Sequence, residues 1–150
     1  MVSAYAQQSR LMPFDYAAQV THLPAALLRK LVRDSVVPGE APFRVQGFVG
    51  YCDIEAAQRV ADELKTARAG LEGRGIRPAE AADKYAFGRD NIYKWLRKGW
   101  IRQIQSDSSD EILVDEGDVA VARALARLVG QGQGKPVFPK GDGPYISQAA

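Results

Sequence analysis

The feature that most constrains this chain is an internal repeat. When the sequence is shifted by 65 residues against itself, residues 11–66 align approximately with residues 76–129. Few aligned residues are identical, but apolar positions keep falling on apolar positions, as Leu27 does on Ile92 and Val60 on Leu125. The alternative is a chance overlap of two amphipathic helical stretches. Because one shift serves three blocks with different periodicities, we favour a small domain that occurs twice.

Each copy begins with a pair of short predicted helices. The segments 13–20 and 78–85 both open with proline, which suits the first turn of a helix because its missing N–H costs nothing there. After a three-residue break, second helices begin at Pro24 and at Arg89. In the second copy the apolar residues of this helix lie at i, i+3 and i+4, on one face, and Gly99 provides a left-handed C-cap. The apolar face consists of Ile92, Trp95 and Leu96.

A strand–turn–strand pattern and a closing helix complete each copy. Residues 43–51 alternate around a glycine, and residues 101–104 and 111–114 flank a polar tip, as β-hairpins do. Closing helices are predicted from residue 53 to about 69 and from about 116 to 129. Plausible N-cap residues are Asp53 and either Asp115 or Asp118.

The order of elements predicts a mainly α fold with small β-hairpin wings. It corresponds to two winged helix-turn-helix repeats in tandem. The second copy, over residues 81–101, resembles the DNA-binding domain of the excisionase and MerR families. The first copy, over residues 16–33, is a weaker match, and together the two copies span about 105 of the 150 residues. No effector domain or long coiled coil follows, so the ligand-sensing part of the MerR family is not implied. The predicted domains are residues 11–69 and 76–129, with a linker at 70–75 and a Gly/Pro-rich tail at 130–150.

Composition narrows the functional classes. The chain has one cysteine, Cys52, and one histidine, His22, so neither a disulfide within the chain nor a zinc cluster is expected. No apolar run approaches the length of a membrane span, and the first ten residues lack the pattern of a secretory signal. These features favour a cytoplasmic, nucleoid-associated binding protein without metal or cofactor, and they argue against an enzyme.

The second copy carries the stronger candidate DNA-binding surface. Residues 89–102 contain five basic residues and one acid. The resemblance places the start of the second helix at the base edges and its flanking residues at phosphates. We therefore expect Arg89 and Asn91 to read bases, because arginine can pair with guanine and asparagine with adenine. The residues expected to contact the DNA backbone are Tyr93, Lys94, Arg97, Lys98 and Arg102. The alternative is an ordinary solvated helix face.

The first copy is the weaker candidate. Its basic residues on the matching helix and wing are Arg29, Lys30, Arg33 and Arg44. The helix begins with proline and two alanines, which cannot read bases. The shift of 65 also places Lys30 where the second copy has Trp95, which predicts a less complete core. Whether the first copy touches DNA is left open.

One feature complicates the DNA hypothesis. Residues 107–118 contain six acids and no base, and an acidic wing tip would repel phosphate. The main hypothesis is a double-stranded DNA-binding protein, either a transcriptional regulator or an excisionase-like architectural factor, that uses the recognition helix of each repeat in the major groove. The alternative is a tandem winged-helix scaffold for protein interactions, resembling chromosome-partitioning adaptors. The tail is predicted to be non-helical. It is either disordered or an extended arm whose apolar residues Val137, Phe138, Tyr145 and Ile146 dock on another surface, which suggests a possible homo-oligomer.

Overall fold

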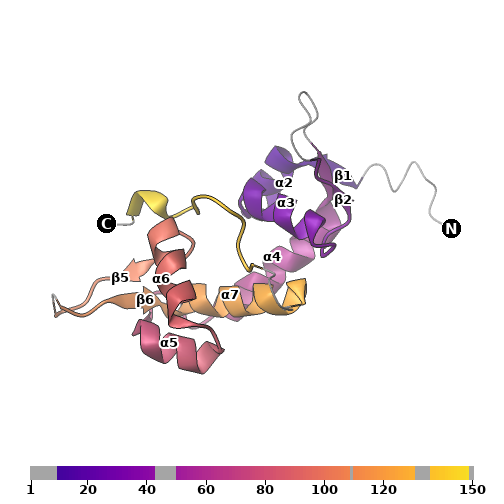
Figure 1. The fold of residues 1–150 in the computed structure, drawn as a ribbon. Helices are drawn as coiled ribbons and strands as arrows, with labels where there is room; N and C mark the ends of the chain where they lie inside the picture. Colours follow the sequence, from indigo (N-terminus) through magenta and orange to yellow (C-terminus); the bar gives the residue numbers. More distant parts are fainter. Residues whose placement is uncertain (1–9, 43–49, 109, 131–135, 149–150) are drawn as a thin grey trace. The chain divides into compact units, whose positions relative to one another are not determined.

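The computed structural model describes residues 10–42, 50–108, 110–130 and 136–148. The chain forms two compact units, shown as a ribbon in Figure 1. One comprises the described residues within 1–63 and 128–139, and the other those within 64–127 and 140–150. No helix among the described residues is long and apolar enough to cross a membrane.

The first repeat contains a three-stranded antiparallel sheet with the strand order β1-β3-β2, and its closing helix α4 contributes residues to both units. Met12 and Gly39 lie on opposite sides of Cys52 in this sheet. The elements are β1 (Leu11–Pro13), α2 (Phe14–Thr21), α3 (Ala25–Arg33), β2 (Gly39–Glu40), β3 (Tyr51–Asp53) and α4 (Ile54–Arg68).

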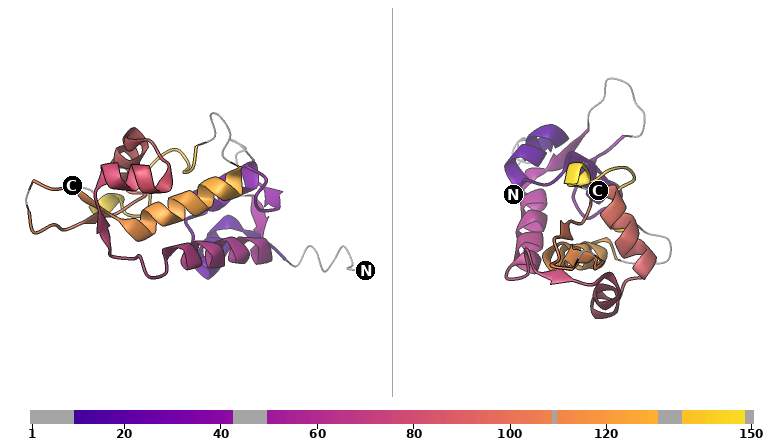
Figure 2. Two further views of the ribbon diagram at one scale, coloured as in Figure 1. Left: turned by 90° about the horizontal axis from the view of Figure 1, so that it is seen from below. Right: turned by 90° about the vertical axis from the view of Figure 1, so that its left-hand side faces the viewer.

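The second repeat has the same order of elements, and its sheet order is β4-β6-β5. Ile76 and Gln103 flank Val114 in this sheet. The elements are β4 (Gly75–Ile76), α5 (Pro78–Tyr85), α6 (Arg89–Lys98), β5 (Gln103–Ile104), β6 (Leu113–Asp115) and α7 (Glu116–Val129). The hairpin of β5 and β6 projects beyond the helices of its own unit (Figures 1 and 2).

The backbone confirms the internal repeat and corrects its register. Left-handed residues end the two paired helices at matching positions, His22 with Ala86 and Ser35 with Gly99. These pairs give an offset of 64 residues through the two helices. The offset falls to 62 at the closing helix, where Asp53 matches Asp115, because the hairpin of the first repeat is two residues longer. The predicted single shift of 65 was therefore wrong by one residue in the paired helices and by three residues in the closing helix.

Equivalent hydrogen bonds support the corrected register. The backbone N–H of Asp53 donates to Pro38 at 2.9 Å, and that of Asp115 donates to Arg102 at 2.9 Å. Each of these aspartates caps its closing helix through Oδ1, with N···O distances of 3.0 Å in the first repeat and 3.2 Å in the second. The predicted caps Asp53 and Asp115 are confirmed. Asp118 instead lies inside the first turn of α7.

Each repeat has its own apolar core. In the second repeat, Trp95 packs edge-on against Phe87, with ring centroids 4.9 Å apart. In the first repeat the corrected register places Leu31, and not Lys30, at the position of Trp95. Leu31 is fully buried, so the expected gap in the first core is absent. Other buried residues include Phe14, Ala17, Leu28, Val37 and Cys52 in the first unit and Ile92, Ile101, Val114 and Val119 in the second.

Two predictions about secondary structure need correction, and one stays untested. The mainly helical fold with small antiparallel strand pairs is confirmed, but each repeat also begins with a strand, β1 or β4, that was not predicted. Most of the hairpin predicted at 43–51 lies outside the described residues and stays a prediction, while β3 begins at Tyr51. The tail is not entirely non-helical, because η1 (Ile146–Gln148) is a short 3-10 helix.

Candidate nucleic-acid interface

Helix α6 is defined by clear local signals. Gly88 precedes it in an extended conformation, Asp90 lies in its first turn, and Arg97 and Lys98 lie in its last turn. These charges complement the helix dipole at both ends. Gly99 ends the helix in the left-handed region at φ 78°. The helix spans about 15 Å, from its 10 residues at a rise of about 1.5 Å each.

The predicted outward face of α6 is confirmed. Ile92 and Trp95 are buried, and Leu96 is half-buried beside them. The exposed residues are Arg89, Asp90, Asn91, Tyr93, Lys94, Arg97 and Lys98. Tyr93 is 41% exposed. The face therefore combines cations, an amide and an aromatic ring.

Four cations of α6 have no internal counter-charge. Within the part of the chain that the structure describes, none of Arg89, Lys94, Arg97 and Lys98 forms an ion pair. Lys94 and Lys98 are four residues apart, a spacing at which like charges destabilise a helix by about 0.2–0.5 kcal/mol. Asp90, four residues before Lys94, offsets this repulsion at the same spacing, so the like-charge pair leaves little net cost in the helix.

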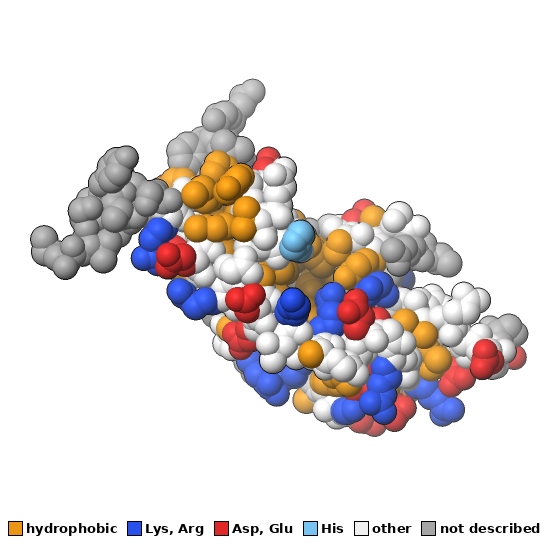
Figure 3. All heavy atoms as spheres, turned by 180° about the vertical axis from the view of Figure 1, so that it is seen from behind, with side chains coloured by type: hydrophobic (Ala, Val, Ile, Leu, Met, Phe, Trp, Pro, Cys, Tyr) orange, Lys and Arg blue, Asp and Glu red, His pale blue; other side chains and the backbone are white. Residues whose placement is uncertain are grey.

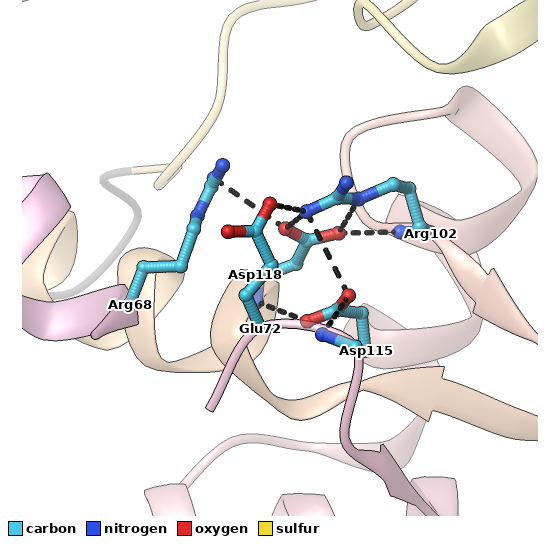
Figure 4. A network of polar contacts seen from close by, with 6 residues as sticks. Arg68, Glu72, Arg102, Asp115 and Asp118 are labelled. Atoms are coloured by element: carbon cyan, nitrogen blue, oxygen red, sulfur yellow. Dashed lines mark hydrogen bonds and ion pairs between the residues drawn. The ribbon is translucent and has the colours of Figure 1, made fainter. Parts of the chain in front are cut away.

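Arg102 lies in a different environment from these four residues. Its Nε donates to Asp118 Oδ2 at 3.0 Å and its Nη2 donates to Asp118 Oδ1 at 3.0 Å (Figure 4). Nη2 also lies 3.3 Å from Glu72 and 3.6 Å from Asp115. The hydrogen bonds to Asp118 raise the pKa of Arg102 despite its partial burial. Arg102 was predicted to contact phosphate, but its guanidinium is engaged by internal carboxylates.

Most of the acids within residues 107–118 are buried or paired inside the second unit. Asp115, Glu116 and Asp118 are buried, and Arg68 at the end of α4 lies 3.4 Å from Asp118. Glu111 accepts a hydrogen bond from Arg77 at 2.8 Å. The remaining acids, Asp107 and Asp110, are exposed in the hairpin. The sequence pattern therefore does not correspond to an acidic surface of six residues.

A second buried ionic cluster involves Glu116. Lys84 Nζ donates to its Oε2 at 2.6 Å, and Tyr85 Oη donates to the same oxygen. Burial alone would raise the pKa of Glu116, but the hydrogen bonds from Lys84 and Tyr85 outweigh this effect and lower it. Sequence reasoning missed this cluster. The available signal was an acid at the first position of a closing helix whose counterpart, Ile54, is apolar.

The candidates of the first repeat are engaged or lie outside the described residues. The Arg29 guanidinium lies over the Phe14 ring, 5.4 Å from its centroid. Lys30 is buried and forms an ion pair with Asp34, and Arg33 donates to the Ala41 carbonyl at 3.5 Å. Arg44 lies outside the described residues. At the position of Asn91, the first repeat has the buried Leu27.

On the face drawn in Figure 3, basic and acidic side chains are interspersed, in keeping with a net charge of +2. Among the described residues, no group of three or more His, Cys, Asp or Glu side chains is placed to hold a metal ion.

Comparison with protein-family models, with curated proteins and with solved structures gives no match.

Proposed function

We propose that this protein binds double-stranded DNA, with α6 of the second repeat in the major groove. The proposal treats the two repeats as winged helix-turn-helix domains in tandem, with α5 and α6 as the paired helices and the β5–β6 hairpin as the wing. A transcriptional regulator and an architectural factor both suit this reading. The observation that carries it is the set of four exposed cations on α6 that form no ion pair with the described part of the chain.

The roles within α6 follow from position. Residues at the start of a recognition helix reach base edges, so Arg89 and Asn91 are assigned to guanine and adenine contacts. Lys94, Arg97 and Lys98 are assigned to phosphates, and the exposed ring of Tyr93 to the DNA backbone. Arg102 is left out of this set because its guanidinium holds Asp118.

The first repeat is assigned no base reading. Its helix α3 begins at Ala25 after Pro24, and Leu27 faces its own core. No polar side chain is available there to distinguish one base from another. The proposal therefore uses one recognition helix for each chain. Of the acids that first suggested the scaffold alternative, Asp115, Glu116 and Asp118 are buried, whereas Asp107 and Asp110 remain exposed in the hairpin.

A salt series tests the proposal. Fluorescence anisotropy of a ~30-bp duplex should show binding that weakens steeply with salt, with a log–log slope of about −0.9 for each phosphate contact. The double variant K94Q/K98Q should reduce the magnitude of that slope by about 1.8. A matched control, R59Q/K65Q, removes two exposed cations of α4 and should leave the slope unchanged. Absence of binding at low salt, or equal loss in both double variants, would overturn the proposal.

A further inference from the structure

The C-terminal segment 140–148, which we term the arm, is anchored to the end of α6. Gly143 N–H donates to the Lys98 carbonyl at 2.7 Å, and Tyr145 N–H donates to the Gly99 carbonyl at 2.9 Å. The indole Nε1 of Trp100 donates to the Gly141 carbonyl at 3.1 Å. All of these residues belong to the second unit. The arm thus satisfies carbonyls that a helix C-terminus leaves without partners.

Two glycines make this close approach possible. A Cβ on Gly143 would lie 2.5 Å from the Gly99 oxygen and 2.7 Å from Trp100 Cδ2. A Cβ on Gly99 would lie 2.3 Å from the Ile146 nitrogen. At both positions the contact involves backbone atoms, which cannot move aside cheaply. Ser35 stands at the position of Gly99 in the first repeat, so this seat is specific to the second repeat.

The arm changes the charge at the end of α6. The C-terminus of a helix carries partial negative charge, which opposes a phosphate group. The arm covers two of these carbonyls with N–H donors. Lys140 directly precedes Gly141, whose carbonyl accepts the hydrogen bond from the Trp100 indole. Lys140 is exposed and forms no ion pair within the described residues, as is also true of Lys98.

We infer that the arm is part of the DNA-binding surface, and that Lys140 contacts a phosphate next to those bound by the last turn of α6. This inference rests on the proposed function and adds an element outside the repeat itself. It requires the arm to be seated on Gly99 and Trp100. Asp142, also exposed on the arm, then lies near the same phosphates and opposes binding.

Opposite charge changes on the arm provide the test. In the anisotropy salt series, K140Q should lower the slope magnitude by about 0.9, and D142N should strengthen binding at low salt. K65Q, which removes an exposed lysine of α4, serves as the matched control and should match the wild type. If the wild type binds with a steep salt dependence but K140Q keeps the full slope, the inference is wrong and the proposed function stands. If the wild type does not bind, both are wrong.

A second variant tests the seat of the arm. G143A should displace the arm, shift tryptophan emission to longer wavelength as Trp100 becomes exposed, and lower the slope as much as K140Q does. Because both changes remove the same contact, K140Q/G143A should reduce the slope magnitude no more than either single variant does. Additive losses would show that Lys140 acts independently of the seated arm, which would contradict the inference.

Discussion

Replacing Arg102 by methionine is expected to destabilise the second unit without removing a DNA contact. The side chain donates two hydrogen bonds to Asp118, a residue that is 1% exposed. Removing one partner of a buried ion pair costs about 3–5 kcal/mol when the other is left unpaired. Here Asp118 keeps the backbone N–H of residue 102 at 2.8 Å and Arg68 at 3.4 Å. We therefore expect a smaller loss, about 2–3 kcal/mol.

The matched control is R97M, which makes the same chemical change on the exposed face of α6. Surface substitutions of this kind stay within about 0.5 kcal/mol. Urea unfolding, followed by circular dichroism, should give a lower midpoint for R102M than for R97M. The anisotropy slope should show the reverse order, with a loss of about 0.9 for R97M alone. An R102M variant with normal stability and a reduced slope would refute the reasoning and return Arg102 to the phosphate contacts.

Three other predictions concern stability and reactivity. The lowered pKa of Glu116 means that its carboxylate stabilises the fold above the pKa of the unfolded chain, and this contribution is lost as pH falls through its folded pKa. E116Q should flatten the acid side of a plot of unfolding free energy against pH. Burial raises the pKa of Cys52 to about 11, so its thiol should react with a disulfide reagent at pH 8 only after unfolding, and fast native labelling would contradict its burial. S35G should stabilise the protein by about 1 kcal/mol because serine is strained at φ 62°, whereas G99A should destabilise it, and calorimetry would reveal a wrong sign in either variant.

The repeat could be read from the sequence because apolar periodicity survives sequence divergence. The register of the repeat could not be read from the sequence. It depends on left-handed backbone conformations at residues whose types do not predict such a conformation. His22 and Ala86 both adopt left-handed conformations, yet neither is glycine. The leading strand β4 contains only Gly75 and Ile76, which are too few to show a period of two. A loop two residues longer in the first repeat then defeats any single shift.

The candidate site divides in the same way. The outward face of α6 followed from helical spacing, which fixes direction without knowledge of the fold. The internal position of the Arg102 side chain depends on Asp118, 16 residues away, and residue spacing alone does not predict that these two side chains meet. A run of basic residues followed by a run of acidic residues in the sequence can form either a polar surface or ion pairs inside the fold. In this chain Arg102 and the buried acids pair, whereas the cations of α6 remain exposed.

The contrast between the repeats follows from where the acids are placed. At the positions of Glu116 and Asp118 the first repeat has Ile54 and Ala56, the apolar solution that usually costs less than a buried ion pair. By burying its acids on α7, the second repeat removes them from the surface while its α6 cations stay exposed. A chain with a net charge of only +2 thereby presents one locally cationic helix. Among the described residues only the second repeat buries carboxylates, and their partners are Arg68, Lys84 and Arg102, so the cations of α6 stay unpaired.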